Sequence, residues 1–345
     1  MSELAVATPA GIYCPRGDFY IDPWEPVSSA VVTHAHADHY CAGCERYLTS
    51  DVGRALLKLR LGDEAVVDGL EFGETMLRNG VQISLHPSGH ILGSAQVRIE
   101  SQGEVCVISG DYKLAPDPTC AAFEPISCHT FITEATFGLP VYRWAEASTT
   151  LAEIGVWRER NRSEGRGSVL FAYAMGKAQR LLAGLGEGAG PVLCHGAVER
   201  LNDVYRQASS DIPPTLHASE VTDRKTLREA LIVAPPSAQR SPWLRRFGDV
   251  GTAFVSGWMQ VRGARRRRAV DRGFVLSDHA DWQGLLDAVD ATGAQRVLVT
   301  HGLTGPFVRH LRELGFDADE LATTYGSVSE EFDEAAPDEV REASQ

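Results

Sequence analysis

Three imidazoles and a carboxylate lie within six residues near the start of the chain. His34, His36, Asp38 and His39 directly follow the apolar run 30–32, which predicts a short strand. A strand alone would not direct all four side chains to one point, but a strand that turns into a loop can gather them. Imidazole nitrogens and carboxylate oxygens are donors that zinc and manganese bind. The spacing therefore predicts a metal site, and four donors this close together indicate two ions.

The same residue types recur where later predicted strands end. Apolar or alternating runs cover residues 81–85, 104–108, 129–133, 273–277 and 295–299. The metal-ligand types at or just after their ends are His90, Asp111, Glu134, His279 and His301. One of these histidines alone would more often be an ordinary core residue, but five such junctions in one chain indicate a shared site. A carboxylate at a strand end is a common bridge between two ions, and Asp111 has that setting.

Asp22 ends a short apolar run ahead of the first histidine cluster. A carboxylate there can hydrogen-bond an imidazole ligand and fix its tautomer, as metal sites usually require. It can equally cap the turn before Pro23. The sequence leaves both interpretations open.

The bulk composition excludes several classes of protein. The 345 residues are 43% hydrophobic, which is enough for a full core and fits two domains or one large domain. No apolar run reaches the 18 residues of a membrane span, and the first residues lack the features of a secretory signal. The seven cysteines are odd in number and scattered, which favours free thiols in a reducing cytoplasm.

Charge is distributed unevenly along a chain whose formal net charge is −13. Acidic residues crowd the segment 330–342, which predicts a disordered, solvated tail. The segment 262–268 is instead dense in arginine, with Arg265, Arg266, Arg267 and Arg268 in succession. This basic block predicts either phosphate contacts or an ordinary solvated surface, and both remain open.

Between residues 151 and 234 predicted strands alternate with predicted helices. The apolar runs 168–173, 191–194 and 230–234 are separated by helical patterns at 178–185 and 198–208. Such alternation favours a parallel sheet flanked by helices, and hence a second α/β unit. A proline-rich link at 235–242 follows it.

In this order the motifs resemble those of the metallo-β-lactamase superfamily. The matching segments are His34-x-His36-x-Asp38-His39, Gly89-His90, Gly110-Asp111 and Thr300-His301-Gly302. Within that superfamily, Thr133-Glu134 and Ser277-Asp278-His279 look like the acidic and additional histidine motifs of the β-CASP nucleases. The resemblance covers the chain to about residue 327 and is closest to the bacterial ligase-associated DNA exonucleases.

The resemblance implies an α/β fold: a metallo-β-lactamase αβ/βα sandwich with an inserted β-CASP α/β cap, and an active site between the two. The implied domains are residues 1–144 and 251–327 for the two halves of the sandwich and 145–250 for the insert, with 328–345 as the acidic disordered tail.

The resemblance also assigns roles to residues. His34, His36 and His90 would hold one ion, and Asp38, His39 and His301 the other, with Asp111 between them. The implied catalytic residues are Asp38, Glu134 and His279, with His279 as general acid oriented by Glu134. Lys177 and Arg265 to Arg268 would contact nucleic acid, although Lys177 can also be a solvated helix start.

The implied activity is a metal-dependent DNA exonuclease of DNA repair, with two divalent ions, zinc first and manganese second, taking part in phosphodiester hydrolysis. An RNA-processing β-CASP ribonuclease is the alternative. The implied partners are DNA with a single strand or a free end, or RNA, together with a DNA ligase and a helicase of the same repair system, and no membrane.

Overall fold

A computed structural model of the chain describes residues 4–186, 190–208 and 211–322. The chain divides into two compact units, one containing residues 4–142 and 279–322 and the other residues 143–278. In the described ranges, no helix is both long and apolar enough for a membrane span.

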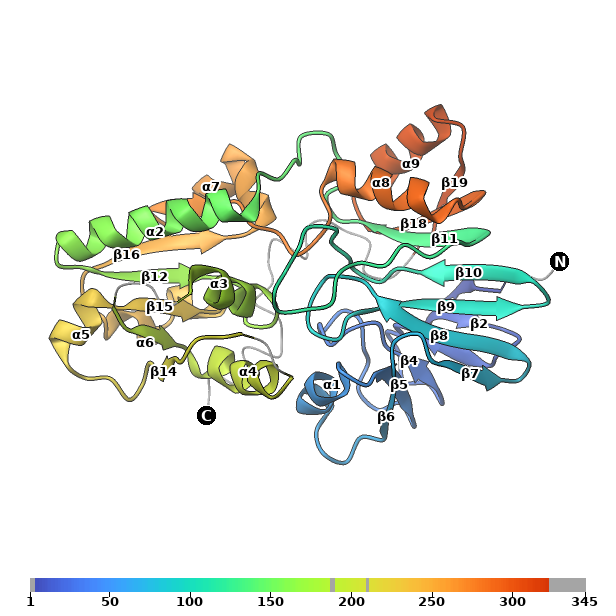
Figure 1. Cartoon of the computed structure of the whole chain (residues 1–345), viewed down its shortest axis with the longest axis horizontal. Helices are drawn as coiled ribbons and strands as arrows, with labels where there is room; N and C mark the ends of the chain where they lie inside the picture. Colours follow the sequence, from blue (N-terminus) through green and yellow to red (C-terminus); the bar gives the residue numbers. More distant parts are fainter. Residues whose placement is uncertain (1–3, 187–189, 209–210, 323–345) are drawn as a thin grey trace. The chain divides into compact units, whose positions relative to one another are not determined.

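The first unit contains two sheets and three helices (Figure 1). The six-stranded sheet runs in the order β1 (Val6–Thr8), β2 (Gly11–Cys14), β3 (Phe19–Ile21), β4 (Ala30–Val31), β5 (Tyr47–Ser50) and β6 (Val67–Leu70). The seven-stranded sheet runs in the order β19 (Asp317–Glu320), β18 (Arg296–Gly302), β11 (Thr130–Ala135), β10 (Glu104–Ile108), β9 (Ala95–Ser101), β8 (Val81–Pro87) and β7 (Thr75–Arg78). The helices are α1 (Arg54–Leu61), α8 (Trp282–Thr292) and α9 (Thr304–Glu313).

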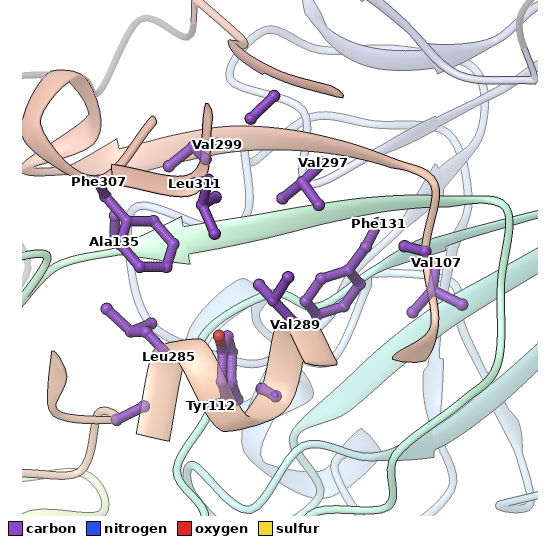
Figure 2. Close-up of a cluster of buried hydrophobic side chains, with 14 of the residues drawn as sticks. Val107, Tyr112, Phe131, Ala135, Leu285, Val289, Val297, Val299, Phe307 and Leu311 are labelled. Atoms are coloured by element: carbon purple, nitrogen blue, oxygen red, sulfur yellow. The ribbon is translucent and has the colours of Figure 1, made fainter. Parts of the chain in front are cut away.

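The seven-stranded sheet has a hydrophobic cluster on each face. On one face, Leu285 of α8 and Leu311 of α9 pack with Phe131 of β11 in a cluster that Figure 2 shows. On the other face, Ile132 belongs to a cluster that also contains Ile21 of the six-stranded sheet. Adjacent side chains of β11 thus point to opposite faces, as the period of a strand requires. The central strands β10 and β11 are buried along almost their whole length, as expected for strands between two hydrophobic clusters.

The central strands of this sheet bring their ends to one edge. β10, β11 and β18 are parallel neighbours, so their carboxyl ends lie together. β4 of the other sheet also ends nearby, because the amide of Ala95 donates to the carbonyl of Thr33 at 2.9 Å. The residues that follow these strands are therefore placed next to one another.

The second unit is built on one parallel sheet. Its strands run in the order β14 (Leu216–His217), β13 (Val192–Cys194), β15 (Leu231–Ala234), β12 (Gly167–Phe171), β16 (Val250–Val255) and β17 (Arg272–Phe274). Its helices are α2 (Ala147–Ser163), α3 (Lys177–Leu185), α4 (Gly196–Gln207), α5 (Arg224–Glu229), η1 (Pro236–Arg240), α6 (Pro242–Arg245), η2 (Gly257–Gln260) and α7 (Arg262–Arg267). All its strand pairs are parallel, which confirms the parallel sheet predicted from the alternation of strands and helices.

The second unit extends further than the sequence predicted. Residues 251–278 were expected in the second half of the sandwich, but β16 pairs with β12 and β17 pairs with β16. The sequence pattern identified these strands correctly, but a strand pattern does not say which sheet a strand joins. The α/β class itself is confirmed, while the cap role of this unit stays a prediction. The predicted tail, residues 328–345, lies outside the described residues.

Candidate metal centre

The predicted ligands meet at the strand ends of the first unit. His34, His36 and His39 follow β4, and His90 lies in the loop between β8 and β9. Asp111 follows β10, and His301 lies near the end of β18. Loops that leave strands at a common edge are a usual place for a site, because the sheet fixes where each loop starts.

Four of these side chains form a compact group of donors. His34 Nε2 and His90 Nε2 each lie 3.1 Å from His36 Nδ1. Asp111 Oδ2 is 3.5 Å from His34 Nε2 and 3.7 Å from His90 Nε2. One donor atom from each of the four residues lies within 4.8 Å of the other three. The structure thus gathers the three histidines predicted for one ion around the carboxylate predicted as the bridge.

The second predicted set is more loosely arranged. His39 Nε2 lies 3.4 Å from Asp111 Oδ2 and 3.7 Å from Asp38 Oδ2. The ring of His301 stacks on that of His39, with centroids 5.3 Å apart and planes 16° apart. Asp38 and His301 are not members of the compact four-donor group. The structure therefore places His39 beside both carboxylates, with His301 against its ring.

The backbone at His301 and Gly302 has positive φ angles. His301 has φ of 55°, and the next residue, Gly302, has φ of 78°. A Cβ atom on Gly302 would lie 2.4 Å from the Cα of Thr136, which leaves no space for any other residue. Glycine is required here by both the positive φ and this close approach. The Thr300-His301-Gly302 motif thus sets the local backbone conformation that orients the His301 imidazole.

Asp22 hydrogen-bonds one of the predicted ligands. Its Oδ2 lies 2.7 Å from His39 Nδ1, and its two oxygens accept the hydroxyl and the amide of Thr33 at 2.6 and 2.8 Å. Asp22 is buried and fixes the Nδ1 proton of His39, which leaves Nε2 directed towards Asp111. Of the two interpretations open from the sequence, the structure places this carboxylate against the imidazole. The sequence analysis missed Thr33, whose only signal is its position directly before His34.

We expect Asp22→Asn to weaken zinc binding by about tenfold to a hundredfold. An amide can present an N–H group to His39 Nδ1, which favours the wrong tautomer and turns a proton towards the metal side of the ring. Competition with a chromogenic zinc chelator measures the change. Asp18→Asn in the neighbouring turn is the control, since its side chain bonds only Tyr13 among the residues described. Equal zinc affinity in the Asp22 variant and the parent would contradict this role.

The charges of the site are strongly coupled. Burial lowers the pKa of His34 well below its usual value, and the His39 ring adds to this effect. Burial also opposes a charge on His39, but Asp111, Asp38 and Asp22 outweigh it and hold the pKa of His39 well above its usual value. Burial alone would raise the pKa of Asp111, but His39 and His279 hold that pKa well below its usual range. The site thus favours an ionised Asp111 beside a protonated His39.

This donor set fits a divalent metal ion. His301 Nε2 is buried and finds no hydrogen-bond partner in the part of the chain described, and the buried His39 Nε2 has only the ionic contact with the carboxylates of Asp111 and Asp38. Such atoms are costly unless something else binds them. Imidazole and carboxylate donors suit zinc or manganese, and a cation would replace the proton that the carboxylates now stabilise on His39. The residues that would hold metal are His34, His36, His90, Asp111, His39, Asp38 and His301.

Glu134 and His279 form a hydrogen-bonded pair next to this group. Glu134 is buried at the end of β11, and its Oε1 and Oε2 lie 3.1 and 3.0 Å from His279 Nδ1. The amide of Tyr112 also donates to Glu134 Oε1, at 2.7 Å. His279 Nδ1 lies 3.9 Å from Asp111 Oδ2. Because Nδ1 lies against a carboxylate, Nδ1 carries the proton of the neutral ring, and Nε2 is the nitrogen that gains or loses a proton when the ring changes its charge.

The sequence analysis missed a buried lysine that joins two ligand loops. Lys113 Nζ donates to the carbonyls of Gly89 and His90 and pairs with Asp117 Oδ2 at 2.9 Å. The side chains of Lys113 and Asp117 are 1% and 3% exposed. The two hydrogen bonds from Lys113 to Gly89 and His90 therefore connect the loop after Asp111 to the loop that carries His90, and Asp117 balances the buried charge of Lys113 from within its own loop. The only sequence signal is a lysine two residues after Asp111.

We expect Lys113→Met to weaken zinc binding, because the bonds to the His90 loop are lost. We also expect it to lower the free energy of unfolding by about 3 kcal/mol, because the Asp117 carboxylate would stay buried without the Lys113 cation. Zinc competition and chemical denaturation measure the two effects. Asp117→Asn is the matched control: it removes the ion pair but keeps the bonds from Lys113 to Gly89 and His90, so zinc affinity should be retained. If both variants lost zinc affinity equally, the loss would come from the ion pair, and the bonds from Lys113 to Gly89 and His90 would have no separate role in metal binding.

The predicted nucleic-acid contacts all lie in the second unit. The ammonium of Lys177 is buried, pairs with Asp278 Oδ2 at 3.1 Å and lies 4.6 Å from the centre of the Tyr173 ring. The alternative of a solvated helix start is therefore wrong for Lys177, because a carboxylate and an aromatic face enclose its charge. Arg266 and Arg267 are exposed on α7, whereas Arg268 lies over the Phe254 ring. The Arg265 side chain lies outside the described part.

Curated proteins similar to this chain include nucleases. It is 35% identical over 311 residues to a protein of Opitutus terrae named a probable DNA ligase, a match that covers 89% of this chain and 30% of the relative. It is 27% identical over 208 residues to endoribonuclease ysh1 of Aspergillus fumigatus, covering 54% of this chain and 23% of the relative. It is 28% identical over 153 residues to cleavage and polyadenylation specificity factor subunit 3 of Dictyostelium discoideum, covering 42% and 18%. These relatives support the metallo-β-lactamase and β-CASP nuclease family.

The chain spans less than a third of the length of these relatives. No family model matches it. Among solved structures, it resembles a protein of unknown function from Enterococcus faecalis V583, with a TM-score of 0.58 and 11% identity over 87% of this chain and 80% of that chain. At this identity the likeness concerns the fold alone.

Proposed function

We propose that the chain is a metal-dependent DNA exonuclease that hydrolyses phosphodiester bonds and acts in DNA repair in the cytoplasm. The observation that carries the proposal is the compact group of His34, His36, His90 and Asp111 with the Glu134–His279 pair beside it. A group of metal ligands next to an imidazole held by a carboxylate is what hydrolysis of a stable ester requires. Residues 143–278 are proposed as the β-CASP insert.

Different residues of the chain have different roles in the proposed reaction. When bound, two divalent ions, zinc or manganese, would supply an activated water and neutralise charge on the phosphoryl oxygens. Asp111 lies between the two sets of ligands and offers one carboxylate to both. Glu134 holds His279 with Nδ1 as the donor, so a proton on Nε2 can pass to the leaving oxygen as its bond to phosphorus breaks. Solvent then returns a proton to Nε2.

The extent of the match to the relative named a probable DNA ligase supports DNA as the substrate. The relative named a probable DNA ligase matches 89% of this chain, whereas the endoribonuclease ysh1 of Aspergillus fumigatus matches 54%. A protein that contains such a unit beside a ligase would trim DNA ends before sealing them. We accordingly propose a DNA ligase and a helicase of the same repair system as partners.

RNA processing is the second candidate function. The relatives named endoribonuclease ysh1 and cleavage and polyadenylation specificity factor subunit 3 support it, at 27% and 28% identity. The position of His301 beside His39 is compatible with RNA processing, because metal ions held by the same ligands could serve the hydrolysis of either polymer. The 2′-hydroxyl is the group by which a protein distinguishes the two.

Digestion of matched single-stranded DNA and RNA oligonucleotides tests the proposal. Each oligonucleotide carries a label on its 5′ or its 3′ end, and metal-stripped protein is supplied with zinc or manganese. Stepwise shortening of DNA from one end is expected, and the label that is released first defines the polarity. Cleavage of RNA in preference to DNA, or of DNA only at internal positions, would replace the exonuclease proposal by the alternative.

A further inference from the structure

A second group of exposed arginines lies in the second unit, outside the block 262–268. It consists of Arg240, Arg245 and Arg246. They lie on η1, on α6 or directly after α6. From residue 230 to residue 270, Asp249 is the only acidic residue of the sequence. In a chain of formal net charge −13, these segments therefore carry a local excess of positive charge.

The two arginine groups are neighbours in space. Gln239 Nε2 donates to the backbone carbonyl of Arg268 and lies 3.4 Å from that of Ala269. Arg240 directly follows Gln239, so the end of η1 lies against the chain that leaves α7. Arg240 is therefore close to the chain that follows α7, and α6 begins two residues after Arg240.

These arginines lack the carboxylate partners that other exposed arginines have. Among the described residues, Arg240, Arg245 and Arg266 form no ion pair, and Arg246 donates only to the carbonyls of Ser219 and Val221. In the first unit, by contrast, Arg46, Arg54 and Arg309 pair with Asp68, Asp51 and Glu313 at 2.7, 3.2 and 3.1 Å. A guanidinium without a carboxylate keeps its charge available for a phosphate.

A tryptophan lies among these arginines. Trp243 of α6 is half-buried, with its ring set edge-on to His195 and Phe247 at centroid distances of 4.9 and 4.7 Å. These two rings fix the indole while part of it stays accessible. Aromatic rings beside cations are the usual means of binding single strands, because each base presents a face that can stack. A duplex keeps those faces in its interior.

We propose that a basic–aromatic surface, formed by Arg240, Trp243, Arg245, Arg246 and Arg266, binds single-stranded nucleic acid. The arginines contact successive phosphates and Trp243 stacks on a base. The inference rests on the proposed function for the chemical class of its ligand, and it adds that the strand is unpaired where it crosses this surface. Any polyanion would meet the arginines, but only an unpaired base uses the indole.

Binding to fluorescein-labelled oligodeoxythymidine, followed by anisotropy over a range of salt concentrations, tests the surface. The full chain carries Asp111→Asn to prevent digestion. Adding Arg240→Gln, Arg245→Gln and Arg246→Gln should lower affinity at least tenfold and reduce the slope of log affinity against log salt by about 2. Trp243→Ala should lower affinity by about fivefold to a hundredfold, and Trp243→Phe by less. The matched control is Arg46→Gln, Arg54→Gln and Arg309→Gln, which removes the same charge from paired arginines.

The outcomes separate this inference from the proposed function. Binding is measured without hydrolysis. Absence of cleavage by the parent chain would therefore overturn the proposed nuclease function, but it would not change the result of the binding test. Equal losses in the two triple variants would mean that net charge alone matters, and would overturn the surface. Unchanged affinity in Trp243→Ala, or equal affinity for single strands, duplex and polyglutamate, would overturn it as well. Intact thermal midpoints of all variants exclude loss of folding as the cause.

Discussion

Asp111→Asn is expected to lower turnover of single-stranded DNA by about a thousandfold or more. Asp111 Oδ2 lies 3.4 to 3.7 Å from the Nε2 atoms of His39, His34 and His90, so this one oxygen faces both sets of predicted ligands. Asparagine preserves the shape of the side chain but removes its charge, and a neutral amide cannot bridge two cations. Turnover in zinc or manganese and bound metal by mass spectrometry measure the effect.

Asp287→Asn is the matched control for this substitution. Asp287 is exposed on α8 and accepts a hydrogen bond from Gln283, so the same chemical change there should leave turnover within about twofold. The bound metal should fall below two ions per chain in the Asp111 variant and stay unchanged in the control. An Asp111 variant that kept turnover within tenfold of the parent would refute the bridging role.

His279→Ala should lower the rate on DNA by about a hundredfold to ten thousandfold while the compact group keeps its metal. His279 Nδ1 donates to Glu134, and the ring lies outside the group of His34, His36, His90 and Asp111. Its proposed task is to protonate the leaving oxygen. The loss should therefore be large for DNA, whose leaving group is a poor one, and small for bis(p-nitrophenyl) phosphate, whose leaving group needs no proton.

Glu134→Gln distinguishes the orientation of His279 from its presence. The amide keeps a partner for the amide of Tyr112 but can present an N–H group to His279 Nδ1, which favours the other tautomer. Its rate on DNA should lie between those of the parent and His279→Ala. If His279→Ala slowed both substrates equally, the residue would act on binding or on the metal site and would not be the general acid.

Most of the proposed metal centre could be predicted because its ligands follow strands. His34, His90 and Asp111 stand where short apolar runs end, and parallel strands align their carboxyl ends at one edge. The pairing of Glu134 with His279 came from the motif resemblance, since 145 residues separate the two and no local pattern connects them. Residues far apart in the sequence can thus be predicted to meet where each follows a strand of the same sheet. A contact between two individual side chains cannot be predicted in this way.

Tertiary contacts account for what could not be predicted. In the sequence, Lys113 is indistinguishable from an ordinary exposed lysine. It is buried and hydrogen-bonded to the His90 loop only because that loop packs against it in the folded chain. Lys177 was expected either to contact phosphate or to start a helix in solvent, but its ammonium is buried and pairs with Asp278. The strand β16 was recognised, yet it joined β12 in the second unit, because pairing depends on the partner surface and not on the strand pattern.

Reconstitution of metal-stripped protein shows whether the chain hydrolyses nucleic acid with two bound ions. Zinc or manganese is added in steps, and bound metal and the rate on end-labelled single-stranded DNA are measured on the same samples. We expect no cleavage without metal and a rate that rises as occupancy approaches two ions per chain, with no such rise in Asp111→Asn. Full cleavage in the presence of a chelator, or two bound ions without cleavage of DNA or RNA, would contradict it.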